Sequence, residues 1–160
     1  MSEQQESAFK IVNKYMWWSS GAGLIPIPFV DLAAVSGVQL KMIADLAKIY
    51  DVPFRESAVK GAIGSLSGFV LPHALACGVV GSMFKAVPVI GFVAGGSAMS
   101  VFCGAYAWAL GNVFIQHFES GGTFLDFDPE AVKEYFKTQF EKGKRVGKTI
   151  DAQEKAQVTV

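Results

Sequence analysis

Three polar side chains lie in stretches that are otherwise apolar, and their types make them the first residues to test for chemistry. His73 follows Pro72 in a long uncharged segment, where a histidine can relay protons or bind a ligand. Its alternative role is that of a buried histidine bonded to a backbone carbonyl that Pro72 leaves without a donor. Asp31 and Gln39 point into the apolar face of a helix predicted over residues 28–50.

The two residues on that predicted helix differ in what their positions explain. Asp31 lies in the first turn, where an acid complements the helix dipole. Gln39 has no such explanation, and its amide must find partners once it is buried. We expect Gln39 to bond to the apolar hairpin described below, at Ser65, Ser67, Ser100 or the carbonyl of Gly68. The alternative is a glutamine that faces water or the polar surface of a neighbouring subunit.

A segment near the C-terminal end imitates a phosphate-binding loop. Residues 143–149 have the sequence Gly-Lys-Arg-Val-Gly-Lys-Thr, with three residues between the glycines where the nucleotide motif has four. It also follows an amphipathic pattern rather than a buried strand, so we reject nucleotide binding. The basic side chains there suit anionic lipid headgroups, with a merely solvated tail as the alternative: Lys142, Lys144, Arg145 and Lys148.

Cysteine, histidine and charge offer little further chemistry. Cys77 and Cys103 both lie in apolar segments, where buried thiols are expected and a bridge between them is the alternative. Two distant histidines make no metal set, and a net charge of zero does not point to nucleic acid. Without a catalytic constellation, we expect a non-enzymatic protein that uses no cofactor.

The element that must position the polar residues is the long apolar stretch over residues 57–118. Residues 61–84 and 86–118 carry no charged side chain, and Lys85 separates them. Each run exceeds the roughly 20 apolar residues that a helix needs to cross a bilayer. We therefore predict a Gly-rich antiparallel helical hairpin embedded in a membrane. The alternative is close packing inside a soluble helical core.

Small residues recur at helical spacing along both arms of this hairpin, which allows two helix backbones to approach closely. We predict that helices pack, and that copies of the chain associate, through eight glycines: Gly61, Gly64, Gly68, Gly78, Gly91, Gly95, Gly104 and Gly111.

Amphipathic helices flank the hairpin in a single all-α domain. Apolar periodicity predicts them over residues 7–18, 28–50 and 129–142. Asp128 is the expected N-cap of the last helix, and residues 143–160 are expected to form a basic and then polar tail.

Aromatic side chains close the first predicted helix at Tyr15, Trp17 and Trp18. We favour the headgroup level of a membrane for them, with the core of a soluble bundle as the alternative. Lys85 is the one basic residue at the hairpin tip, and the others flank the hairpin. This charge distribution predicts an inner-membrane protein with both termini in the cytoplasm.

Three motifs occur in a characteristic order. They are Ile-Pro-Ile-Pro-Phe at 25–29, Lys-Ala-Val-Pro-Val-Ile-Gly at 85–91 and Ala-Leu-Gly at 109–111. Together they resemble the YcjF-type family of unknown function that accompanies bacterial GTPases. The chain departs from the family pattern at Val89, where the family favours glycine, and at Ala107, where it favours threonine nearby. The resemblance implies a membrane-associated partner of a small GTPase and supplies no catalytic residue.

The prediction from the sequence is therefore a non-enzymatic membrane anchor or scaffold. It would contact lipids, form homo-oligomers and hold a cytoplasmic partner such as a GTPase acting in trans. Two alternatives remain open: a homo-oligomeric membrane channel or membrane-remodelling scaffold, and a soluble helical lipid-binding protein.

Overall fold

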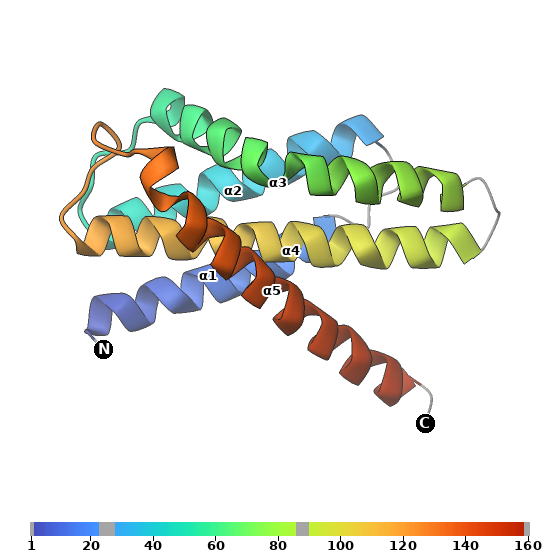
Figure 1. The fold of residues 1–160 in the computed structure, drawn as a ribbon. Helices are drawn as coiled ribbons and strands as arrows, with labels where there is room; N and C mark the ends of the chain where they lie inside the picture. The colour runs from blue at the N-terminus through green and yellow to red at the C-terminus, as the bar shows by residue number, and fades with distance from the viewer. Residues whose placement is uncertain (1, 23–27, 86–89, 159–160) are drawn as a thin grey trace.

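The structure is a computed structural model that describes residues 2–22, 28–85 and 90–158, with side chains described at 2–21, 36–70 and 100–149. Within these ranges the chain forms five helices and no strand, which confirms the all-α prediction (Figure 1). The helices are α1 (Glu3–Ala22), α2 (Pro28–Ile49), α3 (Glu56–Lys85), α4 (Ile90–Glu119) and α5 (Pro129–Val158).

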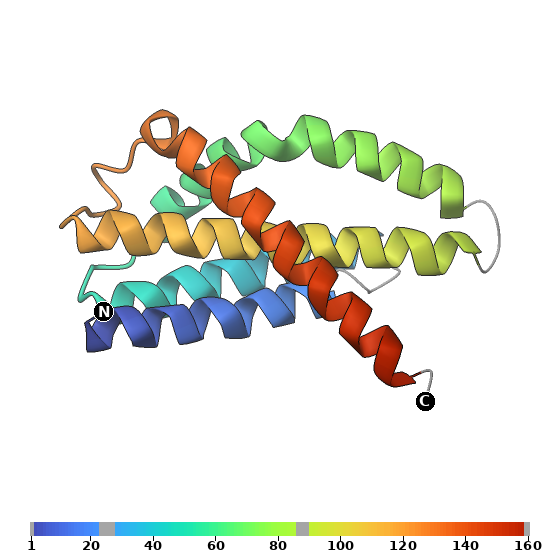
Figure 2. The ribbon, with the colours of Figure 1, turned by 60° about the horizontal axis from the view of Figure 1, so that its bottom comes forward.

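Helix α4 is the centre of the molecule, because each of the other four helices packs against it. It forms an antiparallel hairpin with α3, while α1 and α2 make a second antiparallel pair beside it (Figures 1 and 2). Helix α5 crosses α4 diagonally. The far end of the hairpin extends beyond the α1–α2 pair, whereas the loops at 50–55 and 120–128 gather at the opposite end of the bundle.

Burial inside the protein explains the apolar sequence of the second half of α4, the half whose side chains are described. Residues 103–115 are all buried except Trp108, which is partly buried. They form the core together with Tyr15, Leu46 and Phe136 from three other helices. No helix among the described residues carries a stretch that is long and apolar enough to cross a bilayer. The predicted embedding in lipid is therefore not supported for this half of α4, which helices of the same chain cover.

The first half of α3 is an amphipathic helix rather than a uniformly apolar hairpin arm. Its buried side chains recur at helical spacing at Val59, Ala62, Leu66 and Val70. On its exposed side, Lys60 Nζ lies 2.7 Å from Glu56 Oε1. The boundary predicted at residue 57 for a membrane-embedded hairpin thus falls in a helix with one polar face.

Helix ends follow from local chemistry, with two differences from expectation. Asp128 caps α5 by accepting a 3.0 Å hydrogen bond from the backbone N–H of Glu130, as predicted. However, α5 continues to Val158 where a polar tail was expected. The added residues are mostly good helix formers, and Gly143 and Gly147 fall on the side of α5 that contacts α4. Helix α1 is also longer than predicted, at Glu3–Ala22.

Candidate functional site

Helices α1 and α5 both reach α4 at the level of its residues 100–108. On the α1 side, Ser100 Oγ donates a 2.9 Å hydrogen bond to the carbonyl of Ser20, and a β-carbon at Gly104 would collide with Ser20 Oγ. On the α5 side, a β-carbon at Gly143 would lie 2.8 Å from Ala105 Cα. At Gly143 the close neighbour is backbone, so glycine is needed there, whereas at Gly104 a larger residue would require Ser20 to move its hydroxyl. These contacts hold residues 16–20 and 142–148 at one level along α4.

Two exposed tryptophans lie on α1 at this level. Trp17 and Trp18 are 51% and 54% exposed, among the most exposed large apolar side chains described. Lys14 Nζ lies 5.2 Å from the ring centroid of Trp18, close enough for a cation–π interaction. The ring of Tyr15 packs edge-on against Trp18 at 5.8 Å. Of the two exposed tryptophans, Trp18 is thus packed against a buried tyrosine and lies beside a lysine.

Four basic side chains of α5 lie at the same level of α4. Lys144 bonds to Glu141 Oε1 at 2.7 Å and lies over the ring of Phe140. Lys142, Arg145 and Lys148 are exposed and form no ion pair with another described side chain. We call the whole set the collar: Trp17, Trp18, Lys142, Lys144, Arg145 and Lys148.

The segment that imitates a phosphate-binding loop lies wholly inside α5. Thr149 Oγ1 donates a 3.0 Å hydrogen bond to the carbonyl of Arg145, one helical turn earlier. Gly147 faces Val101 of α4 at ordinary van der Waals distance, and Gly143 faces Ala105 more closely. Gly143 therefore allows close helix packing, and Gly147 lies on the same side of α5.

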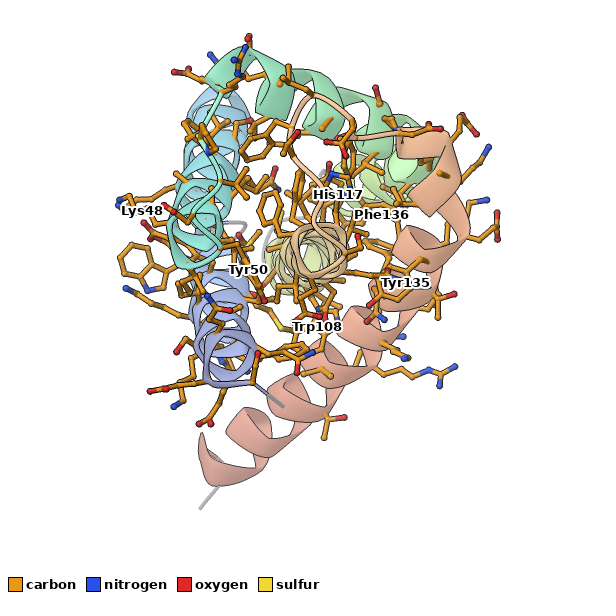
Figure 3. All side chains as sticks on the ribbon, turned by 90° about the vertical axis from the view of Figure 1, so that its left-hand side faces the viewer. Lys48, Tyr50, Trp108, His117, Tyr135 and Phe136 are labelled. Carbon is orange, nitrogen blue, oxygen red and sulfur yellow. The ribbon has the colours of Figure 1, made fainter. Side chains whose placement is uncertain are left out.

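A second polar group lies at the opposite end of the bundle, around the end of α4. His117 Nε2 is 2.8 Å from the carbonyl of Thr123 and 4.0 Å from Asp126 Oδ1. The N–H and the hydroxyl of Thr123 both donate 2.6 Å bonds to that same carboxylate oxygen. These bonds hold the pKa of the Asp126 carboxyl below its usual range. Figure 3 faces this end of the molecule and labels His117.

Glu119 joins three helices at this end. It accepts hydrogen bonds of 3.1 Å from the Tyr50 hydroxyl and from Gln5 Nε2. Burial, followed by the bond to Glu119, raises the pKa of Tyr50 to about 12. This arrangement ties the start of α1 and the end of α2 to the end of α4. No group of three histidine, cysteine or carboxylate side chains suited to a metal ion occurs in the described part of the chain.

The structure places the predicted site residues in very different surroundings. Gln39 is 4% exposed, but the serines expected to bond to it have other partners: Ser65 bonds to Gly61, Ser67 to Ile63 and Tyr106, and Ser100 to Ser20. In the described part of the chain no hydrogen bond joins Gln39 to these serines, and the link stays a prediction. Cys103 is buried.

The eight predicted packing glycines divide into three groups. Gly104 and Gly111 face α1 closely, against Ser20 and Val12. Gly61, Gly64 and Gly68 have no atom of another element within 4 Å of an added β-carbon. The remaining three glycines, Gly78, Gly91 and Gly95, fall outside the residues whose side chains are described. The same holds for two of the predicted polar residues, Asp31 and His73.

Sequence reasoning did not find the group around His117. Its sequence signals are the Gly121-Gly122 pair and the three-residue spacing of Thr123 and Asp126, which is typical of a side chain that closes a turn. Gly121 adopts a positive φ of 81°, and a β-carbon at Gly122 would collide with the His117 ring. The two glycines therefore let the loop fold back onto the histidine.

Comparison with known proteins gives a family and one informative relative. Residues 1–145 match the family described as Domain of unknown function (DUF697). The chain is also 34% identical over 149 residues to "Magnetosome membrane protein 22" of Magnetospirillum gryphiswaldense, covering 93% of this chain and 76% of that protein. No solved structure is significantly similar to the chain. On the extent of the family match, the chain belongs to the family described as Domain of unknown function (DUF697).

Proposed function

We propose that this protein is a non-enzymatic scaffold that rests on a membrane through its collar. The collar brings exposed tryptophans from α1 and basic side chains from α5 to one level of α4, and this observation carries the proposal. Tryptophan is favoured at the headgroup level of a bilayer, and lysine and arginine are attracted to anionic headgroups there.

The hairpin beyond the collar supports this orientation. Residues 71–99 contain one charged residue, Lys85. With a rise of about 1.5 Å per residue, the helix from Val101 back to Ile90 is roughly 16 Å long, about half of a 30 Å hydrocarbon core. We infer that the hairpin enters one leaflet. Because the other basic residues lie on the collar side of the tip, both termini would be cytoplasmic at the inner membrane.

The magnetosome relative supports a membrane role of this kind, and the partner is proposed from the sequence resemblance alone. A protein named as a magnetosome membrane protein is 34% identical to this chain over 149 aligned residues, which cover most of both lengths. The resemblance to the YcjF-type family, noted from the sequence, suggests that the scaffold holds a cytoplasmic GTPase that acts in trans. Neither role requires catalytic chemistry from this chain.

The test is flotation of the full chain with lipid vesicles. Vesicles of phosphatidylglycerol and phosphatidylcholine provide the anionic surface, and vesicles of phosphatidylcholine alone the neutral one. Two variants probe the collar: Trp17→Ser with Trp18→Ser, and Lys142→Glu with Arg145→Glu. The control is Lys133→Glu with Lys137→Glu, which reverses two charges in the first half of α5, outside the collar. Both lysines form ion pairs there, so thermal melting checks that the control variant still folds.

We expect the wild type and the control to float with anionic vesicles and both collar variants to lose most of this binding. The loss in the lysine–arginine variant should be greater on anionic than on neutral vesicles, because that contact is electrostatic. A wild type that stays at the bottom of the gradient would contradict the proposal. An equal loss of vesicle binding in the control and in the collar variants would also contradict the proposal, because binding would then not depend on where the charges lie on the protein.

The exposed glycines of α3 support a second candidate function, a homo-oligomeric membrane scaffold. Gly61, Gly64 and Gly68 leave open space on the described surface of α3, and small residues allow two helices to approach closely. Gly64→Leu would then reduce the size of the assembly in gentle detergent. An unchanged size would remove this face from consideration.

A further inference from the structure

Two loops at the end of the bundle opposite the collar expose large apolar side chains. Leu125 is 74% exposed in the loop between α4 and α5, and Phe54 is 41% exposed in the loop between α2 and α3. The ring of Phe54 packs edge-on against Phe124, the neighbour of Leu125, with centroids 6.0 Å apart. The two loops therefore form one surface, which we call the loop tip.

Single exposed leucines are common on proteins and need no explanation. Leu125 differs because the loop is anchored on both sides of it. On one side Phe124 is buried against Phe114 and Phe118. On the other side Phe127 stacks on Phe114, with ring centroids 4.9 Å apart and planes 12° apart.

Polar bonds fix the loop backbone between these anchors. Asp126 Oδ1 accepts bonds from the N–H and the hydroxyl of Thr123, while the hydroxyl of Thr123 accepts a 3.3 Å bond from the N–H of Leu125. The ring of His117 also holds the loop, through a hydrogen bond between Nε2 and the carbonyl of Thr123. A loop backbone that is already fixed loses little further entropy on binding, so the loop presents Leu125 from a preorganised position.

The charge around the loop tip is opposite to that of the collar. Across residues 50–56 and 119–128 the acidic side chains are Asp51, Glu56, Glu119, Asp126 and Asp128, against the one basic residue Arg55. Of these, Asp51, Asp126 and Asp128 are exposed and have no lysine or arginine partner among the described side chains. A partner at this end therefore needs positive charge around an apolar centre.

We propose that the loop tip docks a protein whose surface has an apolar socket bordered by lysine or arginine. Leu125 enters the socket, Phe54 packs beside it, and the acidic side chains pair with the basic border. This assignment rests on the proposed scaffold function, because it gives the surface that receives the scaffold's partner on the side away from the membrane.

The experiment places a photo-crosslinking amino acid, p-benzoylphenylalanine, at position 125 of the full chain in its native membranes. The control position is Thr138, an exposed site on α5 away from the loop tip. A second chain carries the probe at Phe54, with and without Leu125→Ser. Thermal melting checks each chain, and vesicle flotation checks the collar independently.

We expect probes at 125 and 54 to capture one protein that the probe at 138 does not. The peptide of the captured protein that carries the crosslink should lie next to lysine or arginine residues of that protein. The crosslinking yield should fall as the salt concentration is raised. Leu125→Ser should reduce capture from position 54 by roughly tenfold, as for a central interface residue. It should leave melting and flotation unchanged, because the side chain is exposed.

Three results would overturn the loop-tip assignment while leaving the membrane proposal intact if flotation persists. They are capture no greater than at position 138, adducts to lipid, and adducts to a second copy of this chain. If the wild type does not float with vesicles but the probes still capture the partner, the membrane proposal alone is overturned.

Discussion

The hydroxyl of Tyr15 donates a 2.6 Å hydrogen bond to Oδ2 of Asp45, and this bond joins α1 to α2 beside the collar. The ring of Tyr15 is buried, and Trp18 of the collar packs edge-on against it. Burial, followed by the bond to Asp45, raises the pKa of Tyr15 above its ordinary value. One interhelical bond thus supports both the α1–α2 pair and the position of an exposed tryptophan.

Removing this bond should destabilise the protein measurably. We expect Tyr15→Phe to lower the free energy of unfolding by about 1–2 kcal/mol, because a hydrogen bond to a carboxylate is lost in a part-buried site. Tyr50→Phe is the matched control, since its 3.1 Å bond to Glu119 is exposed and should contribute less than about 1 kcal/mol. Urea denaturation measures both, and equal losses would argue against the special role of Tyr15.

Alkaline pH should destabilise the fold through buried tyrosines. Burial raises the pKa of Tyr106 from 10.0 to about 12, so the folded chain holds this proton more tightly than the unfolded chain. The resulting stabilisation is complete below pH 10 and is lost as the pH rises towards 12. We expect the free energy of unfolding to fall over this range, and to fall less steeply in Tyr106→Phe. Identical slopes in the two proteins would assign the effect to other groups.

A non-glycine residue in the left-handed conformation ends α2. Asp51 has a φ of 56°, and the N–H of Val52 donates a 2.8 Å bond to the carbonyl of Ala47, as in a helix-terminating turn that favours glycine. We expect Asp51→Gly to raise the free energy of unfolding by about 0.5–1 kcal/mol and Asp51→Ala to lower it. A destabilised Asp51→Gly variant would mean that the carboxylate itself stabilises the turn.

Periodicity and caps predicted the starts of α2 and α5, because both signals act over a few residues. Asp128 and Pro129 mark the start of α5, and the start of α2 at Pro28 agrees with the sequence. The surroundings of α4 could not be predicted in the same way. A helix surrounded by protein and a helix surrounded by lipid are both apolar on all sides, so composition does not separate them.

The collar shows the same division between local and tertiary information. Trp17, Trp18 and the α5 lysines are each recognisable in the sequence as candidates for a membrane surface, yet only the crossings at Gly104 and Gly143 place them at one level of α4. The sequence also did not show whether a glycine faces a neighbour or open space. Gly111 and Gly64 have similar sequence surroundings and opposite environments in the fold.

These two glycines give a matched pair of substitutions. A β-carbon at Gly111 would lie 2.5 and 2.8 Å from the two methyl carbons of Val12, which is fully buried, whereas one at Gly64 meets nothing within 4 Å. We expect Gly111→Ala to lower the free energy of unfolding by about 1–2 kcal/mol through overpacking between α1 and α4. Gly64→Ala should raise it by about 0.5–1 kcal/mol, because alanine is the better helix former. Denaturation in urea measures both, and Val12→Ala combined with Gly111→Ala should recover part of the loss by making room for the new methyl group. If Gly111→Ala is as stable as Gly64→Ala, then α1 does not pack on α4 as described, and the shared level of the collar residues is wrong as well.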